Sequence, residues 1–300
     1  MKHYRYSLDK SSKKFICPKC HKKTFVKFID IETETYLQEE YGRCDRETNC
    51  GYFNTPTSEH INTFEKVTVS KPETSYHGLE LVDKMYAEEP NSNNFTEFLK
   101  TKFTAEEVFT AMQKYFITDS NERWQGATVF WQIDNLEKVH AGKILHYNRQ
   151  NGRRMKDENN KSSIDWIHSL LKKNKSIPEF NLSQCLFGLH LINENKTKTV
   201  ALVESEKTAV IMSIFKPNYT WLATGSKSGL KYQFLKPIKD YRIIAFPDKG
   251  EYSDWFHMAE QLNKLGFKIT VNDWLENSDY KTGTDIADVN LKEYKEPQNR

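Results

Sequence analysis

The sequence lacks any apolar run of the roughly 18 residues that a membrane-spanning helix requires. Its first fifteen residues also lack the apolar core of a secretion signal. A membrane protein and a secreted protein are therefore both disfavoured, and we expect a cytoplasmic chain without a membrane partner. The formal net charge is only +3, so the total charge indicates no particular class of partner.

Cysteine is scarce, and its distribution is uneven. Four of the five cysteines lie between positions 17 and 50, and the fifth is Cys185. In a chain without a secretion signal, closely spaced cysteines indicate metal ligands rather than disulfides. Cys185 stands beside Leu186 and Phe187, which is typical of a buried structural thiol.

The residues that are present indicate a folded protein with more than one domain. A chain of 300 residues exceeds what one hydrophobic core usually organises, so two or three domains are expected. Aromatic residues make up 13% of the chain, which excludes a disordered protein. Residues 1–30 hold nine Lys/Arg and two Asp/Glu, which is typical of a polyanion-binding segment or of a solvated, disordered start.

The four clustered cysteines predict a zinc ribbon over residues 1–58. Cys17 and Cys20 form a Cys-x2-Cys knuckle, in which a tight turn directs two thiolates at one ion. Cys44 and Cys50 form the second pair, with a wider spacing than usual. Because so short a segment cannot build a large core, we expect Zn²⁺ to be structural here.

A linker and helices are expected next. Residues 59–78 are rich in Thr, Ser, Pro and Asn and lack periodicity, which predicts a linker. Helices are expected over 79–86 and 92–118, and the second is interrupted at Thr104, where a capping box with Glu107 starts a new helix. Helical spacing places three apolar side chains in the core: Phe109, Met112 and Phe116.

Residues 79–198 are predicted to form a mixed α+β subdomain with a basic hairpin. GATVFWQID alternates like a strand, and KVHAGKILHYNRQNGRRMK predicts a hairpin whose Asn151-Gly152 pair suits a type I′ turn. Its candidate phosphate contacts are Lys143, Arg149, Arg153, Arg154 and Lys156, with Tyr147 among them. Five like charges without an acid repel each other unless an anion is near, so phosphate contact is favoured over a solvated hairpin tip.

Residues 199–300 alternate strands with helices. TVALVE, TWLA, YRIIAFP and FKITVND are the expected strands, and Gly266 closes the helix before the last of them. This order predicts an α/β domain with a parallel four-stranded sheet flanked by helices. Ligands of such sheets bind beyond the carboxyl ends of the strands.

Two carboxylates follow apolar strands at that edge. Glu204 is the first residue beyond one strand, and Asp248 is the first charged residue beyond another. Either acid alone would be an ordinary helix N-cap, but two neighbouring carboxylates repel each other unless a cation lies between them. Mg²⁺ or Mn²⁺, which prefer oxygen ligands, fit the pair. Further acids are near in sequence: Glu206, Glu251, Asp254, Asp285 and Asp288.

These segments resemble a known family. VALVESEKTAVI followed by IIAFPDKGEYSDW is similar to a TOPRIM domain, the fold shared by bacterial primases, topoisomerases and certain nucleases. TVFWQID and GKILHYNRQNGRRMK resemble the basic half of the bacterial primase polymerase core, while QCLFGLHL and LATGS resemble short primase segments around the first TOPRIM strands. The order of zinc ribbon, basic subdomain and TOPRIM domain resembles short TOPRIM-like proteins of mobile elements and phages of Bacteroidetes-type bacteria.

The resemblance implies a DNA primase that makes primers on single-stranded DNA from nucleoside triphosphates. It implies that Glu204 and Asp248 are catalytic and hold Mg²⁺ or Mn²⁺, with Glu251 as a further ligand. It assigns contacts with template phosphates or the incoming triphosphate to Lys143, Arg149, Arg153 and Arg154, with Lys207 as a further phosphate contact. A replicative helicase is a further partner that the resemblance suggests.

The chain departs from the family at one motif. The family's Asp-x-Asp is Asp248-Lys249-Gly250 here, so the second acid is missing, and Glu251 or Asp254 in the following turn is the candidate replacement. Two alternatives stay open. The same carboxylates would serve a TOPRIM-type metal-dependent nuclease, and a non-catalytic DNA-binding replication accessory protein would show a steep salt dependence without turnover.

Overall fold

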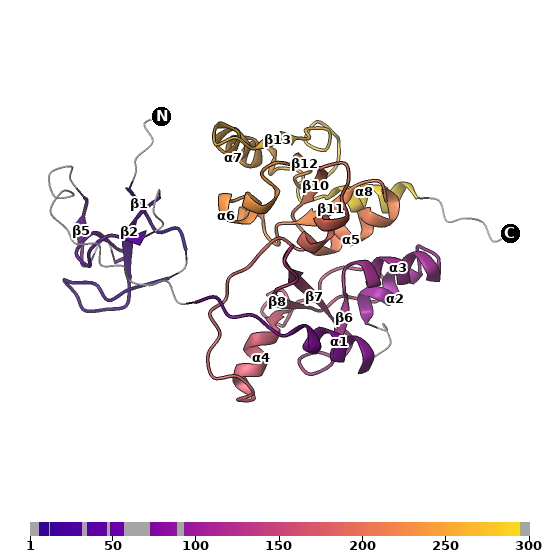
Figure 1. Cartoon of the computed structure of the whole chain (residues 1–300), viewed down its shortest axis with the longest axis horizontal. Coiled ribbons are helices and arrows are strands. Elements are labelled where there is room, and N and C mark those ends of the chain that lie inside the picture. Colours follow the sequence, from indigo (N-terminus) through magenta and orange to yellow (C-terminus); the bar gives the residue numbers. More distant parts are fainter. Residues whose placement is uncertain are drawn as a thin grey trace. The chain divides into compact units, whose positions relative to one another are not determined.

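The computed structural model describes residues 6–11, 13–31, 35–46, 49–56, 73–88 and 93–294. The chain divides into two compact units, Met1–Glu73 and Thr74–Arg300 (Figure 1). Most of the predicted linker lies outside the described residues. Among the described helices, none is long and apolar enough to cross a membrane.

The first unit is built from short antiparallel strands. They are β1 (Tyr6–Leu8), β2 (Phe25–Asp30), β3 (Thr35–Tyr36), β4 (Gly42–Cys44) and β5 (Phe53–Asn54). Their order is β1-β2-β4-β5, and β3 also pairs with β2. Four residues form the small buried core: Cys17, Phe25, Cys44 and Cys50. A core this small leaves much of the stability of the unit to its thiolates and any ion they hold.

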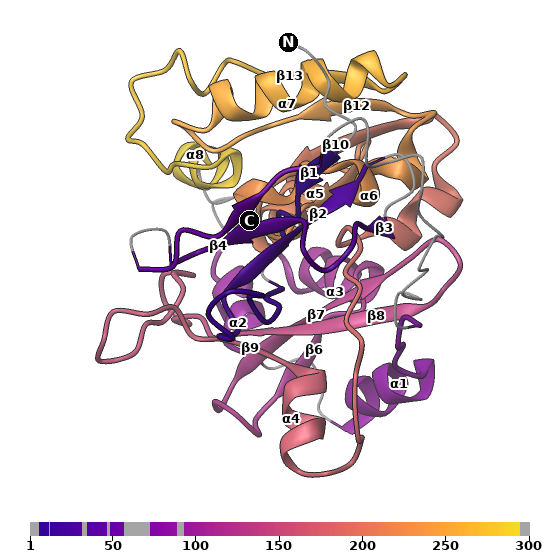
Figure 2. The same ribbon diagram turned by 90° about the vertical axis from the view of Figure 1, so that its left-hand side faces the viewer.

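The second unit contains two four-stranded sheets, which lie one above the other in Figure 2. The lower sheet is antiparallel, with the order β6 (Thr118–Ser120), β7 (Ala127–Ile133), β8 (Val139–Leu145) and β9 (Ile164–Trp166). Every residue of β7 and β8 is buried. One face of this sheet packs a core with α1 (Leu79–Glu88) and α4 (Ile167–Lys173).

The upper sheet is parallel, as the sequence predicts. Its order is β11 (Thr220–Ala223), β10 (Thr199–Val203), β12 (Arg242–Ala245) and β13 (Lys268–Val271). The helices of this region are α5 (Glu206–Phe215), α6 (Tyr232–Leu235), α7 (Tyr252–Lys264) and α8 (Ile286–Glu293), with short 3-10 turns at Leu189–Glu194, Lys227–Gly229 and Lys236–Ile238. Gly266 follows α7 with φ +90°, a conformation that favours glycine, so it ends the helix as expected.

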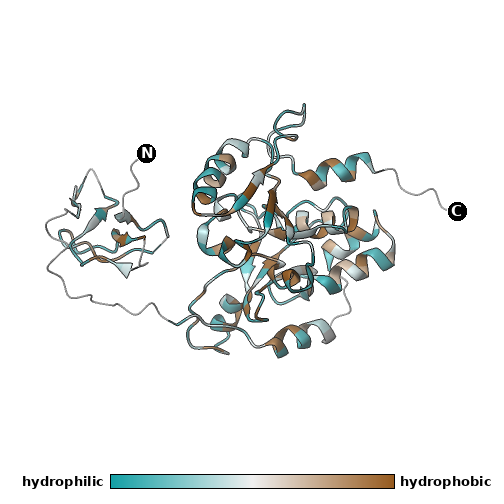
Figure 3. Ribbon diagram, turned by 45° about the horizontal axis from the view of Figure 1, so that its top comes forward, coloured by the Kyte–Doolittle hydropathy of each residue, from teal (hydrophilic) through white to brown (hydrophobic). Residues whose placement is uncertain are grey.

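Two large cores hold this unit together. The first combines α2 (Asn94–Lys100), α3 (Ala105–Lys114), β7 and β8 with α5, α8 and one face of the upper sheet. The second lies on the other face of that sheet and includes Trp255, Ala259 and Leu262 of α7. Figure 3 shows apolar residues along the strands and alternating with polar ones along the helices. Because the first core crosses the boundary predicted at residue 198, segments 79–198 and 199–300 pack as one unit.

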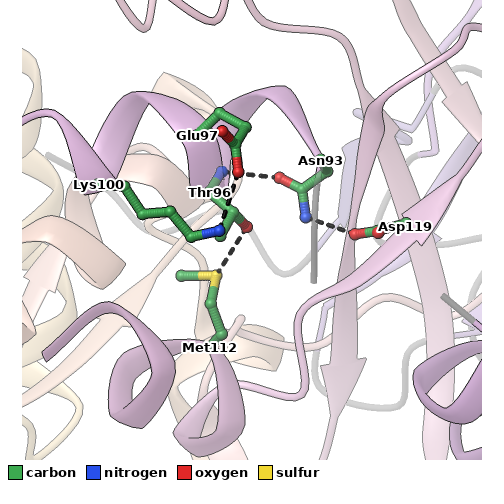
Figure 4. A network of polar contacts seen from close by, with 6 residues as sticks. All are labelled: Asn93, Thr96, Glu97, Lys100, Met112 and Asp119. Atoms are coloured by element: carbon green, nitrogen blue, oxygen red, sulfur yellow. Dashed lines mark hydrogen bonds and ion pairs between the residues drawn. The ribbon is translucent and has the colours of Figure 1, made fainter. Parts of the chain in front are cut away.

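A buried asparagine fixes the start of α2 against the lower sheet (Figure 4). The Asn93 side chain accepts from the Thr96 N–H at 2.9 Å, which caps the helix. It also donates to Asp119 of β6 at 2.6 Å and accepts from the Thr128 hydroxyl of β7 at 2.9 Å. This polar junction fixes the position of α2, whose C-terminal end forms one wall of a groove in the second unit.

Two local expectations are wrong. The capping box between Thr104 and Glu107 is present and Met112 is fully buried, but Phe109 and Phe116 are 51% and 40% exposed. The helix ends at Lys114, so Phe116 lies beyond it and does not share the helical face on which the sequence placed the three apolar residues.

The predicted type I′ turn is also absent from the basic hairpin. Gly152 has φ +63°, but Asn151 is not among the residues with positive φ, and a type I′ turn needs both. The backbone N–H groups of Asn148 and Gly152 instead bond to the carbonyls of Arg153 and Asn148, at 2.8 and 2.9 Å. These bonds enclose a longer loop than a two-residue turn. The main antiparallel partner of β8 is β7.

Candidate functional site

The four clustered cysteines converge in the first unit. Cys17 and Cys20 lie in a turn before β2, Cys44 ends β4, and Cys50 lies in the turn before β5. The Cys17–Cys50 and Cys20–Cys44 sulfur pairs are 3.7 and 3.9 Å apart, and all four sulfurs lie within 4.8 Å of one another. Tetrahedral Zn–S bonds of about 2.3 Å imply sulfur separations of roughly 3.8 Å. The donor set and its spacing therefore fit structural Zn²⁺.

Replacing Cys44 by serine is expected to remove zinc from the protein. A Cys₄ site that loses one thiolate loses both charge and a strong bond, so we expect zinc, measured by plasma mass spectrometry, to fall from about one ion per chain to near zero. Cys185→Ser is the matched control, because Cys185 lies in the second unit outside the cluster. Zinc retained at full occupancy in Cys44→Ser would contradict the assignment.

Glu204 and Asp248 lie at adjoining ends of two strands. β10 and β12 are parallel neighbours in which Leu202 pairs with Ala245. Glu204 therefore follows one strand end and Asp248 follows the next, both half-buried. The two strands are thus neighbours, which is the condition under which the sequence places the two carboxylates at one edge of the sheet.

Asp248 lies among several other carboxylates. Its pKa is raised to about 8, first by burial and then by the charges of Asp285, Glu204, Asp288 and Glu251. Burial and the charge of Glu251 also raise the pKa of Glu204. Carboxylates that raise one another's pKa are stabilised by a nearby cation, because it offsets the repulsion of their ionised forms.

The first turn of α8 brings two of these acids to the strand ends. Asp285 is the N-cap of α8 and accepts from the Asp288 backbone N–H at 2.7 Å. The Thr208 hydroxyl of α5 donates to the other Asp285 oxygen at 2.6 Å, which joins the starts of both helices. The sequence marked both acids only as nearby. An Asp directly before an apolar helical segment is the capping signal that places the first of them.

Gly250 stands in place of the second family acid, and the residue before it, Lys249, has its own partners. The Lys249 ammonium donates to the carbonyl oxygens of Glu276, at 3.0 Å, and Ser278. Its backbone N–H donates to the Thr284 carbonyl at 2.9 Å. Lys249 therefore organises the loop between β13 and α8.

Of the two candidate replacement acids, Glu251 has the clearer electrostatic effect on Glu204 and Asp248. Its charge raises the pKa of both Glu204 and Asp248, and it pairs with Lys227 at 3.2 Å. Asp254 is exposed in the first turn of α7 and is not among the charges that raise the pKa of Asp248.

The carboxylates at the ends of β10 and β12 are spaced more widely than the four cysteine sulfurs. Within the described ranges, the four cysteines are the only group of three or more potential ligands whose atoms lie within 4.8 Å of each other. Mg²⁺ keeps several waters and is usually held by one or two carboxylates together with substrate phosphates. The half-buried pair Glu204 and Asp248, with Glu251 nearby, suits a cation held in that way.

Neutralising Asp248 is expected to stabilise the protein at alkaline pH when it holds zinc but no other divalent cation. The pKa of Asp248 is about 8 in the folded protein, above its usual value of 3.8, so the folded state binds more protons than the unfolded state between these pH values. The free energy of unfolding therefore falls as pH rises through this window. We expect Asp248→Asn to raise it by about 2 kcal/mol at pH 8 and by little at pH 4.

Urea unfolding at the two pH values measures this difference. Asp254→Asn is the control, because Asp254 is an exposed acid of the same segment. If Asp248→Asn changed the free energy of unfolding equally at pH 4 and pH 8, the repulsion between Asp248 and its neighbouring carboxylates would be contradicted.

Two of the predicted phosphate contacts lie in the interior. Lys143 is 6% exposed, and its ammonium donates to Glu206 Oε1 at 2.8 Å and to the Gly225 carbonyl at 3.0 Å. Tyr147 is 2% exposed and packs its ring against Phe95. Buried side chains with these partners are not available to a nucleic-acid strand, so the structure assigns Lys143 and Tyr147 to the fold.

The remaining predicted bases lie at the hairpin tip and at the start of α5. Tyr147 and Arg154 pair across the base of the tip. Lys207 is three residues beyond Glu204 and lies 3.8 Å from Asp288. Arg149, Arg153 and Lys156 are exposed, and Arg154 and Lys207 are half-buried. Their contact with phosphates stays a prediction.

Comparisons with solved structures find similar folds at low identity. The RNA polymerase domain of Mycobacterium tuberculosis primase DnaG matches with 12% identity and a TM-score of 0.46, over 71% of this chain and 77% of that one. The primase fragment of the bacteriophage T7 primase-helicase matches with 15% identity and a TM-score of 0.44, over 94% and 95%. The Aquifex aeolicus primase, with its zinc-binding and RNA polymerase domains, matches with 12% identity and a TM-score of 0.45, over 96% and 77%.

Comparisons of the sequence itself give two families. No curated protein matches the chain. A family model described as a putative zinc beta-ribbon finger matches residues 4–65, in agreement with the thiolate cluster. A second model, described as a domain of unknown function, matches residues 93–249, which is 157 of the 300 residues. Because this match spans more than half of its length, the chain belongs to the DUF6371 family.

Proposed function

We propose that this chain is a primase-like nucleotidyltransferase, which binds single-stranded DNA and joins nucleoside triphosphates into primers with Mg²⁺ or Mn²⁺. The observation that carries the proposal is the position of Glu204 and Asp248 at the adjoining ends of β10 and β12, with further acids around them. Sequence segments that resemble the primase core and its TOPRIM domain surround both acids.

The parallel order β11-β10-β12-β13 supports a TOPRIM assignment for residues 199–300. The segment VALVESEKTAVI supplies β10 and the start of α5, and IIAFPDKGEYSDW supplies β12 and the start of α7. Both segments that carry the resemblance therefore lie at the edge where such sheets bind ligands.

In the proposed reaction, Glu204 and Asp248 hold the cation and Glu251 supports them. A divalent cation there would neutralise triphosphate charge and favour attack by a 3′-hydroxyl. Arg153, Arg154 and Lys207 would bind and orient phosphates, since Arg presents paired donors that match phosphate oxygens.

A non-catalytic DNA-binding protein is the second candidate, and one observation favours it. The position of the missing family acid is Gly250, which has no side chain that could hold a cation. A site that needs two acids in that motif would be incomplete, whereas binding to single strands through the basic residues would not be affected.

Labelled nucleotide incorporation on single-stranded DNA, with Mg²⁺ or Mn²⁺, tests the proposal. Short labelled products from the wild-type protein are expected. Shortened template strands in the same gel would favour the nuclease, and salt-sensitive DNA binding without any product would favour the accessory protein. Both outcomes contradict primer synthesis.

A further inference from the structure

A groove of about 780 Å³ lies in the second unit beside the acidic edge. The hairpin tip, the C-terminal end of α2, the start of α5, residues 279–284 and α8 form its walls. Its volume falls in the range of about 300–1,000 Å³ that is typical of sites for small ligands.

The charge of the groove is strongly positive. The bases that line it are Lys102, Arg153, Arg154, Lys207, Lys281 and Lys292. The acids that line it are Asp279 and Asp288, so six positive and two negative charges leave a surplus of four. Walls of one sign focus the field within a groove, and this groove therefore attracts an anion with several charges.

The hairpin tip that carries Arg153 and Arg154 packs closely against α2. A Cβ on Gly152 would lie 2.5 Å from a ring carbon of Phe98, and Gly152 has φ +63°, so the tip is seated closely on α2. The Asn148 side chain also accepts from the backbone N–H groups of Gln150 and Asn151, at 2.9 and 3.1 Å. A tip held in this way loses little freedom when a ligand binds Arg153.

The groove adjoins the strand-end acids through shared residues. Asp288 lines the groove, and its charge contributes to the raised pKa of Asp248. Thr284 also lines the groove, and its carbonyl accepts from the Lys249 N–H directly after Asp248. An anion in the groove would thus lie next to a cation held at that edge.

Aromatic stacking contributes little to this groove. Within the part of the chain that the structure describes, Tyr280 and Phe98 are the only aromatic residues that line it. The Lys292 ammonium lies 5.4 Å from the Tyr280 ring centre, the Tyr280 hydroxyl donates to Glu293, and Phe98 is buried beneath the tip. Sites that follow a single strand of nucleic acid combine basic residues with exposed rings on which bases stack. The groove therefore suits phosphates rather than bases.

We propose that this groove binds the polyphosphate group of a nucleoside triphosphate, through Arg153, Arg154 and Lys207 together with Lys281 and Lys292 of the C-terminal wall. A triphosphate has a charge of about −4 at neutral pH, because its terminal phosphate ionises with a pKa near 6. This charge balances the surplus of the groove. The role of that nucleotide as a substrate rests on the proposed function, but the binding does not.

Calorimetric titration of the zinc-loaded full chain with inorganic tripolyphosphate, without added divalent cation, tests the binding. The double variant Lys281→Gln/Lys292→Gln is expected to bind about tenfold more weakly than wild type, since two charge-assisted contacts are removed. The matched control is Lys264→Gln/Lys268→Gln, in which two exposed lysines outside the groove are changed. Unchanged affinity in the groove variant, or equal weakening in the control, would overturn the proposal.

Two further readouts separate this proposal from its alternatives. Affinity for an unstructured DNA strand is expected to change less than threefold in the groove variant, and a large loss for DNA with unchanged tripolyphosphate affinity would make the groove a strand-binding track. Groove-dependent tripolyphosphate binding in a protein that makes no primers keeps this inference and removes the proposed function. Primer synthesis with an unchanged nucleotide KM in the groove variant keeps the proposed function and removes this inference.

Discussion

Glutamine at position 204 is expected to lower the rate of primer synthesis by about 100-fold or more while DNA binding stays within twofold of wild type. Mutation of a residue that hydrogen-bonds a metal ligand typically lowers metal affinity or activity by about 10–100-fold, and loss of a carboxylate ligand itself has at least that effect. Glu204 is half-buried at the end of β10, so the amide also replaces a charge in a partly desolvated place.

The matched control is Glu260→Gln. Glu260 is an exposed acid of α7 that lies 3.7 Å from His257 and outside the strand-end cluster. Primer synthesis is measured as labelled product per minute, and DNA binding by fluorescence anisotropy. Full activity in Glu204→Gln would show that this carboxylate does not take part in the reaction.

The second large effect is expected from the buried pair of Lys143 and Glu206. Their side chains are 7% and 1% exposed, and the second Glu206 oxygen is buried with no hydrogen-bond partner among the described residues. Lys143→Ala leaves the Glu206 charge buried and uncompensated, which typically costs about 3–5 kcal/mol. We expect a loss of that size in the free energy of unfolding.

Urea unfolding followed by tryptophan fluorescence measures this loss. All six tryptophans belong to the second unit, so the signal reports on the unit that contains the pair. The double variant Lys143→Met/Glu206→Leu is expected to recover most of the lost stability, since apolar side chains of similar volume often replace a buried ion pair well. A single variant as stable as wild type would contradict the assignment of Lys143 to the fold.

The sequence could predict the acidic edge because its signals are local. Apolar strands followed by a charged residue, with helices between them, are enough to place Glu204 and Asp248 at the carboxyl ends of a parallel sheet. Cysteine spacing likewise predicts the thiolate cluster, which the sulfur separations confirm.

Other features depend on packing between distant segments. Lys143 belongs to a basic run in the sequence, but pairing of β7 with β8 turns it inward, where Glu206, 63 residues away, accepts from it. The basic run in the sequence therefore predicts that the Lys143 side chain is exposed, whereas the structure buries it.

The groove was beyond sequence reasoning for the same reason. Lys102, Lys281 and Lys292 lie far from the hairpin along the chain and meet it only in the folded unit. No periodicity or spacing connects them. The shared core of α2, β8, α5 and α8 brings them together.

Counting bound Mn²⁺ by electron paramagnetic resonance tests the central claim most directly, because it needs neither DNA nor turnover. With zinc already in the thiolate cluster, wild type is expected to bind Mn²⁺ saturably, and Asp248→Asn to bind it at least about tenfold more weakly. Asp254→Asn, the exposed acid of α7, is expected to match wild type. Equal Mn²⁺ binding by all three proteins, or no saturable binding by wild type, would contradict a metal site at the ends of β10 and β12.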